Sequence, residues 1–336
     1  MKAFGFAATA IVAVVTGTAM AGQQQAPAAA PRIERLDPAF DTLLDSNAKV
    51  EELASGFSFT EGPLWHQGRL WFSDVTGDKL RTVDANGRAT VVLENAGGLP
   101  NPPAGANIGP NGLAVARGGD ILMAQMGARR IVRRGANGTL TPVVADYQGK
   151  RLNSPNDLVV GSDGTIWFTD PPFGLFNGMD KDPAKQLPYN AVFRYANGTL
   201  TPVITDLPLP NGIALSPDGR TLYVSNYGAP GTIYAYSIGA DGSLSGKRTV
   251  FDFPKDGPGG ADGMKVDSRG NIWATGPDGV WIVSPQGKAL GRIRMGVQTA
   301  NLAFGNDGRT LYITASKGVY RVKTKVAGLL PNNAVR

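Results

Sequence analysis

The chain of 336 residues contains no cysteine and a single histidine, His66. The absence of cysteine excludes disulfides, thiolate metal sites, cysteine nucleophiles and a lipid-modified cysteine. A Ser-His-Asp hydrolase is excluded as well, because His66 would be its only possible base and no G-x-S-x-G sequence occurs. A zinc site of histidines and cysteines and a histidine-ligated haem are not expected for the same reason. His66 itself stands beside Gln67-Gly68, and we interpret it as a turn residue.

The chain also lacks long basic clusters and, beyond its N-terminus, apolar stripes at helical spacing. The net charge is +6 and the pI about 9.5, but the 33 Lys and Arg residues are scattered, with short clusters such as Arg129–Arg134. Nucleic-acid binding needs a basic groove with stacking aromatics, so we assign the charge to a solvated surface and expect no nucleic-acid partner. The sequence does not indicate an oligomeric state.

The N-terminus has the pattern of a secretory signal peptide. Lys2 precedes an apolar stretch from Ala7 to Val15, and Ala19-Met20-Ala21 fits an A-x-A cleavage site. The stretch is too short for a membrane anchor, so we predict cleavage after Ala21 and export to the periplasm or the medium. Residues 22–47, which begin with a Gln-, Ala- and Pro-rich stretch, are expected to form a flexible lead-in.

The chain is rich in glycine, with 45 residues, and contains 24 prolines. It also contains a sequence motif that occurs six times. Each copy opens with a small polar or acidic residue and continues as strand, tight turn and strand. The opening residues are Glu61, Asn111, Asn156, Asn211, Asp262 and Asn301. A unit of roughly 40 to 50 residues that is rich in short strands is typical of propeller blades. The sequence therefore predicts an all-β, six-bladed β-propeller over residues 48–326, with four antiparallel strands in each blade.

The last copy lacks a fourth strand, because the chain runs from Val319–Lys325 into a C-terminal tail, residues 327–336. The segment Lys49–Ala54, which precedes the first copy, has the pattern of the missing strand. We therefore predict that strands from both termini share the sixth blade and close the ring, which removes the exposed edge that an open sheet would present.

A propeller directs equivalent positions of its blades toward one axis, so the opening residues are expected to meet there. Glu61, Asn156, Asn211 and Asp262 would supply four oxygen donors, two of them charged, to a hard divalent cation such as Ca²⁺. Asn-Gly and Asp-Gly pairs are also common turn formers, and Asn111 and Asn301 could simply bond backbone groups. Glu61 is the more informative residue, because glutamate is not a turn former and an axial carboxylate without a partner is costly to bury.

At these positions the chain resembles a superfamily of six-bladed propellers. It includes gluconolactonase, regucalcin (senescence marker protein), luciferin-regenerating enzyme and, more distantly, diisopropyl fluorophosphatase and paraoxonase. The motifs that carry the resemblance are EGPLW, SPNDLVV, GTIWFTDPPFG, LPNGIALSPD and ADGMKVD, and SPNDLVVGSDGTIWFTDPPFG is similar to bacterial gluconolactonases. Two positions depart from the family pattern: Met126-Gly127 replaces a His-Gly pair, and Ser154 stands where animal lactonases have arginine.

The resemblance implies a metal held by Glu61, Asn211 and Asp262, with Asn156 binding it directly or through water. Asp262 would act as both ligand and base in opening a sugar lactone such as glucono-1,5-lactone. Asn111, Asn156 and Asp170 are candidate substrate-binding residues, although Asp170 could equally cap a strand end. The metal could also be Zn²⁺, Mn²⁺ or Fe²⁺. A phosphotriesterase-like activity at the same site, or a non-catalytic propeller that binds a partner, is the alternative.

Overall fold

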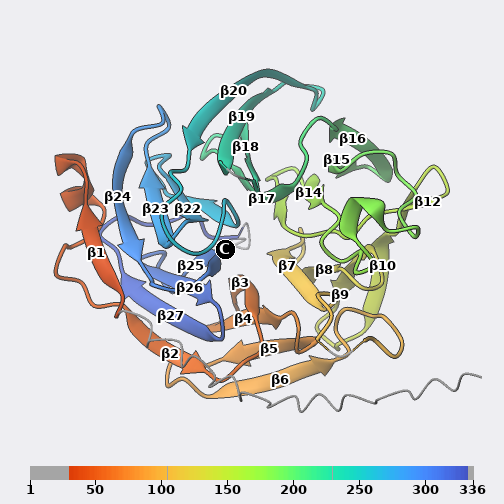
Figure 1. Ribbon diagram of the computed structural model, residues 1–336, viewed down its shortest axis with the longest axis horizontal. Coiled ribbons are helices and arrows are strands. Elements are labelled where there is room, and N and C mark those ends of the chain that lie inside the picture. Colours follow the sequence, from red (N-terminus) through yellow and green to blue (C-terminus); the bar gives the residue numbers. More distant parts are fainter. Residues whose placement is uncertain (1–29, 104, 229, 332–336) are drawn as a thin grey trace, which may run out of the picture.

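Short antiparallel strands joined by tight turns make up the computed structural model, which describes residues 30–103, 105–228 and 230–331. The strands form six sheets around a central axis, as Figure 1 shows. Within the described residues the helical segments are two short 3-10 helices. The predicted six-bladed propeller with four antiparallel strands in each blade is therefore confirmed.

The first three strands of each blade run from the axis outward in chain order. The first strands of the six blades are β3 (Thr60–His66), β7 (Pro110–Val115), β13 (Leu158–Val160), β17 (Pro210–Leu215), β21 (Met264–Val266) and β25 (Thr299–Gly305). The second strands are β4 (Arg69–Asp74), β8 (Ile121–Gln125), β14 (Ile166–Asp170), β18 (Thr221–Asn226), β22 (Ile272–Gly276) and β26 (Thr310–Ala315). The third strands are β5 (Lys79–Val83), β9 (Arg130–Arg134), β15 (Ala191–Ala196), β19 (Thr232–Ile238), β23 (Gly279–Val283) and β27 (Gly318–Lys323). The fourth strands are β6 (Ala89–Glu94), β10 (Leu140–Val144), β16 (Thr199–Ile204), β20 (Leu244–Asp252), β24 (Ala289–Arg294) and, in the sixth blade, β2 (Glu51–Ser55).

The turns between first and second strands follow the predicted glycine pattern. Gly164 and Gly219 have φ values of +88° and +68°, which a residue with a side chain rarely adopts. His66 is the last residue of β3 and pairs with Arg69, so it stands in the strand beside the first hairpin turn of blade one and not in the turn itself, which corrects the interpretation from the sequence. A further small hairpin, β11 (Asp146–Tyr147) with β12 (Lys150–Arg151), projects from the ring between blades two and three.

Strands from both termini close the ring. β2 pairs antiparallel with β27, with Glu51 opposite Arg321, so blade six is the predicted composite. Blades one and six also pack together through the rings of Trp65 and Tyr312, which stack with centroids 5.3 Å apart. This apolar contact and the β2 pairing together hold the first and last blades against each other.

The segment before β2 is not the flexible lead-in that its composition suggested. β1 (Arg32–Arg35) pairs with β24 as a fifth strand of blade five, and the 3-10 helix η1 (Pro38–Thr42) follows it. Phe40 is fully buried there, and the Arg292 guanidinium donates to the Glu34 carboxylate. These two anchors explain why residues 32–47 are part of the fold. Residues 22–29 lie outside the described residues.

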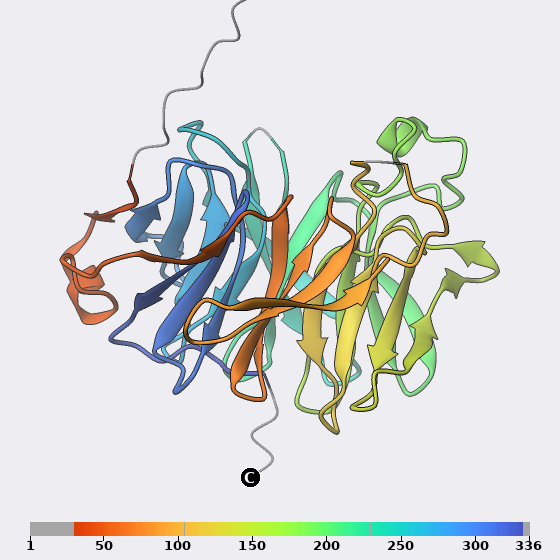
Figure 2. The ribbon, with the colours of Figure 1, turned by 90° about the horizontal axis from the view of Figure 1, so that it is seen from below.

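Two long segments rise above one face of the ring. The described residues of 95–109 form no strand, and residues 171–190 contain only the 3-10 helix η2 (Met179–Lys181). Figure 2 shows η2 at the top of the molecule, on the opposite side from the C-terminal end. The Asn107 amide donates to the Phe173 carbonyl at 3.5 Å and so connects the two segments.

The opposite face contains a mostly apolar cavity of about 500 Å³ along the axis. It is lined by parts of all six first strands or the turns after them and by residues 328–331 of the C-terminal segment. That segment is part of the fold as far as it is described, because the Leu329 N–H donates to the Val266 carbonyl at 3.0 Å.

No helix in the described ranges has the length and apolar character needed to cross a membrane. The predicted signal peptide, residues 1–21, falls before the first described residue.

Candidate functional site

The first residues of the six copies of the repeated motif stand at equivalent places around the axis. Glu61, Asn111 and Asn211 are the second residues of their strands, and Asn301 is the third residue of β25. Asn156 and Asp262 precede β13 and β21 by two residues. All six side chains are buried, with at most 7% of their surface exposed. The sequence therefore brings six polar side chains to the inner ends of the blades.

Glycines that follow four of these residues allow the blades to approach closely. A Cβ added at Gly62 would lie 2.0 Å from the Asn111 carbonyl oxygen, and one at Gly212 would lie 2.2 Å from the Asp262 carbonyl oxygen. Such contacts with backbone cannot be relieved by rotating a side chain. The Asn-Gly and Asp-Gly pairs, which could have indicated turns, thus mark strand positions where the next blade packs against the backbone.

Hydroxyl groups on the second strands fix the backbone of the same residues. Ser73 donates to the Asn111 carbonyl at 2.6 Å, Thr169 to the Asn211 carbonyl at 2.7 Å, and Ser225 to the Asp262 carbonyl at 2.7 Å. In each case the donor lies in the preceding blade. The pocket residues are therefore held by their neighbours as well as by their own strands.

Asp170, a candidate substrate-binding residue, is held by backbone groups at the end of its strand, and its contact with substrate stays a prediction. It is fully buried, and its carboxylate accepts the backbone N–H groups of Asn153 at 2.7 Å and Ser154 at 2.8 Å. Asp74 and Asn226 end their second strands in the same way and hold Ser58–Phe59 and Leu209. The structure thus agrees with the alternative interpretation, a strand-end cap that positions the segment before Asn156.

The Asp170 cap leads to a prediction on pH dependence. Burial raises the pKa of Asp170 to about 7, although the N–H groups of Asn153 and Ser154 and the charge of Arg129 oppose this. The folded protein therefore binds a proton that the unfolded chain releases near pH 4, and this residue makes the fold less stable as pH rises from about 4 to 7. Between pH 5 and pH 8, the free energy of urea unfolding should fall by roughly 2–4 kcal/mol more for wild type than for Asp170→Asn. A constant difference between the two proteins would contradict this assignment.

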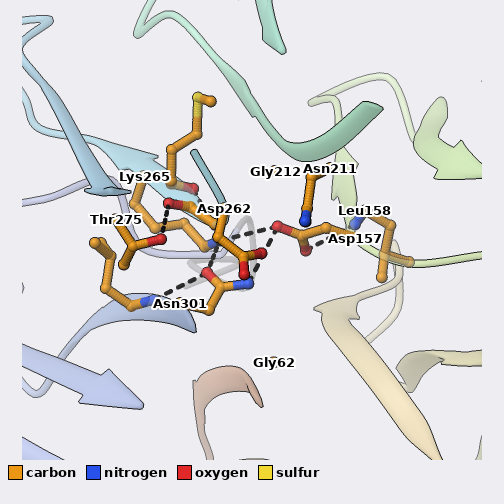
Figure 3. Close-up of polar contacts among 12 residues, drawn as sticks. Gly62, Asp157, Leu158, Asn211, Gly212, Asp262, Lys265, Thr275 and Asn301 are labelled. Atoms are coloured by element: carbon orange, nitrogen blue, oxygen red, sulfur yellow. Dashed lines mark hydrogen bonds and ion pairs between the residues drawn. The ribbon is translucent and has the colours of Figure 1, made fainter. Parts of the chain in front are cut away.

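Three of the predicted metal ligands meet at the axis. The Glu61 and Asp262 carboxylates are within hydrogen-bonding reach of each other, and the Asn211 side chain bonds Asp262. Figure 3 shows Asp262 and Asn211 directed toward this centre. The Oδ1 atoms of Asn156, Asn211 and Asp262 are buried and have no hydrogen-bond partner among the described residues. Unpaired buried oxygens are costly, so their number here indicates a place for a cation.

Sequence reasoning missed Asp157 and Lys265 and left open whether Asn301 only bonds backbone groups. The Asn301 amide donates to Glu61 Oε2 at 3.1 Å and to Asp157 Oδ2 at 3.3 Å, while Lys265 Nζ lies 3.9 Å from Asp157 Oδ2 (Figure 3). The available signal was Asp157 itself, because four of the other copies have glycine at this position. Asn301 thus connects Glu61 with Asp157, and Lys265 brings a positive charge to the same cluster.

Crowding of negative charge shapes the chemistry of the centre. Burial and the neighbouring Asp157 charge raise the pKa of Glu61 to about 7. Burial, followed by the charges of Glu61 and Asp157, raises the pKa of Asp262 well above its usual value. A carboxylate of raised pKa is a better proton acceptor near neutral pH. A bound cation would instead favour the charged forms and release protons.

The donor set fits a hard cation better than a zinc ion. Within residues 30–331 as described, no three His, Cys, Asp or Glu side chains are grouped as a metal site, so amide oxygens would have to complete the coordination. Two carboxylates and two amides are ligands that Ca²⁺ accepts. Asn111 also has an Oδ1 without a hydrogen-bond partner among the described residues, while its amide donates to Met126 Sδ at 3.3 Å.

Comparisons with known proteins agree with the fold. The family described as "SMP-30/Gluconolactonase/LRE-like region" matches residues 59–317. A gluconolactonase of Zymomonas mobilis is 37% identical over 96% of this chain and 94% of its own length, and a pentonolactonase of Haloferax volcanii is 26% identical over 77% and 81%. The structure of a gluconolactonase from Xanthomonas campestris has a TM-score of 0.77 and 30% identity, covering 89% of this chain and 98% of that one.

Proposed function

Because this chain belongs to the SMP-30/gluconolactonase/LRE-like family, we propose that it is a hydrolase that opens a sugar lactone. The observation that supports this most directly is the convergence of Glu61, Asn211 and Asp262 at the axis, with unpaired oxygens directed into one site. The gluconolactonase of Zymomonas mobilis and the pentonolactonase of Haloferax volcanii also match this chain over most of their lengths.

We further propose that the enzyme depends on one divalent cation, with Ca²⁺ the best match to the donors. Glu61, Asn156, Asn211 and Asp262 would hold it, since three of these four have a buried side-chain oxygen without a partner in the described chain. When bound, the cation supplies Lewis-acid polarisation of the lactone carbonyl. Zn²⁺, Mn²⁺ and Fe²⁺ are the other ions to be compared.

The protein's own residues would carry the proton and orient the reactants. Asp262 would accept a proton from the attacking water, because its carboxylate lies at the axis with one buried oxygen that has no partner in the described chain. Water adds to the carbonyl carbon, the ring C–O bond breaks, and the proton passes to the released oxygen to give a hydroxy acid. Asn156 and Asn211 would orient substrate oxygens, and Asn111 would be a further substrate-binding residue.

Removing the metal should abolish the activity. We expect a chelator to lower the rate of acid release from glucono-1,5-lactone by about 100-fold or more, because the remaining groups cannot stabilise the oxyanion alone. A panel of sugar lactones, assayed by the fall in pH with each divalent ion restored in turn, identifies the metal and the substrate. A control melting curve shows whether the chelated protein is still folded. Full activity in chelator would contradict the metal dependence, and no lactone opening with any ion restored would favour a partner-binding propeller.

The N-terminal pattern supports export as a separate proposal. The mature protein should begin at Gly22 and be found in the periplasm or the medium. Mass measurement of the protein from fractionated cells checks this. Retention of residues 1–21 in the cytoplasm would contradict it.

A further inference from the structure

Two aromatic side chains stand close to the centre without a role in the chemistry proposed so far. Phe173 lies in the segment that follows β14, and Tyr227 follows β18 directly. Their rings meet edge to face with centroids 5.8 Å apart and an interplanar angle of 80°. Both are only partly buried. They come from blades three and four, which also supply Asn156 and Asn211.

Tyr227 is held between the segments that lead to Asn211 and Asp262. Its N–H donates to the Leu209 carbonyl at 2.8 Å, two residues before Asn211. Its ring packs on Gly260, two residues before Asp262, so closely that an added Cβ would lie 2.7 Å from the ring. This placement brings the phenol near Asp262.

The Tyr227 hydroxyl is suited to donate a hydrogen bond. Burial and the charge of Asp262 raise its pKa, so it stays protonated at any physiological pH. Within the described part of the chain it has no hydrogen-bond partner. A half-buried phenol with a free donor beside a reactive centre is a group that a ligand can use.

Phe173 is fixed by Ser154, two residues before Asn156. Ser154 Oγ donates to the Pro171 carbonyl at 2.6 Å and accepts the Gly174 N–H at 2.9 Å. Ser154 therefore holds the loop that carries Phe173, and the hydrogen bond from the Asn107 amide to the Phe173 carbonyl holds it at a second point. An aromatic ring held in this way loses little freedom when a ligand packs on it.

We propose that Phe173 and Tyr227 form an aromatic wall of the substrate site that selects hydroxylated lactone rings. A sugar lactone has an apolar C–H face, which packs on the two rings, and hydroxyl groups at its edge, one of which accepts the Tyr227 hydrogen bond. This inference rests on the proposed lactonase function and specifies its substrate class.

The test compares a hydroxylated with an unsubstituted ring of the same size. The full-length protein, Tyr227→Phe and Phe173→Leu are assayed with glucono-1,5-lactone and δ-valerolactone. Tyr227→Phe should lower kcat/KM about tenfold on the sugar lactone and less than twofold on the unsubstituted one, because only the first loses a hydrogen bond. Phe173→Leu should raise KM about three- to tenfold on the sugar lactone with little change in kcat.

Tyr234→Phe, on the third strand β19, is the matched control and should change neither rate. If wild type opens the lactones and Tyr227→Phe keeps the wild-type ratio between them, the aromatic wall is overturned while the lactonase function stands. If wild type opens neither lactone, the proposed function falls and this inference with it.

Discussion

Replacing Asp262 with asparagine is expected to lower kcat for lactone opening by about 1,000-fold at saturating metal. Asparagine keeps an oxygen for the cation but cannot accept a proton, so the loss should greatly exceed the loss of metal affinity. The measurement pairs kcat at saturating cation with a calorimetric dissociation constant for the same ion. The metal-free variant should remain folded, because the substitution removes one of the mutually repelling buried charges.

Glu61→Gln is the matched control for this experiment. It removes the same charge from the facing carboxylate, and Glu61 has no proposed proton-transfer role. It should weaken metal binding while leaving kcat at saturation within about tenfold of wild type. If Glu61→Gln and Asp262→Asn lose the same amount of kcat at saturating metal, Asp262 acts only as a ligand.

Replacing Gly212 with alanine should destabilise the fold by about 3 kcal/mol or more. The new Cβ would lie 2.2 Å from the Asp262 carbonyl oxygen and 2.8 Å from Gly263 Cα, both backbone atoms of the next blade. Relief requires blades four and five to separate, which also displaces Asp262. The variant should therefore lose activity together with stability, as followed by denaturant unfolding and by the lactone assay.

Gly228→Ala provides the comparison, because a Cβ there would lie no nearer than 3.4 Å to any heavy atom outside its chain neighbours. Its unfolding free energy should stay within about 1 kcal/mol of wild type. Wild-type stability in Gly212→Ala would mean that the blades do not pack as closely as described.

The ring was predictable because its pattern is local and repeated. Each copy contains its own strand alternation and turn glycines, and the segment Lys49–Ala54 has the pattern of a fourth strand. The observed β2, Glu51–Ser55, differs by one or two residues at each end. β1 was not predicted, because its four residues, three of them charged, show no alternation of apolar and polar side chains. Its partner β24 also lies over 250 residues away in the sequence.

The site was only partly predictable for a different reason. An Asn-Gly pair can form a turn or stand where two blades touch, and the choice depends on a neighbour more than 40 residues away, as for Gly212 and Asp262. Asp170 could equally have faced substrate or backbone. Lys265 could not be predicted as a site residue, because nothing near it in sequence indicates that it reaches Asp157 from another blade.

The pairing of β2 with β27 has a consequence for how the chain reaches its final form. Glu51–Ser55 leave the ribosome early, yet their partner, Gly318–Lys323, is among the last parts to be made. Until residue 323 has emerged, the sixth blade cannot be completed and an unpaired strand remains available to other chains. Nascent protein must therefore be kept apart from its copies for nearly the whole time of its synthesis.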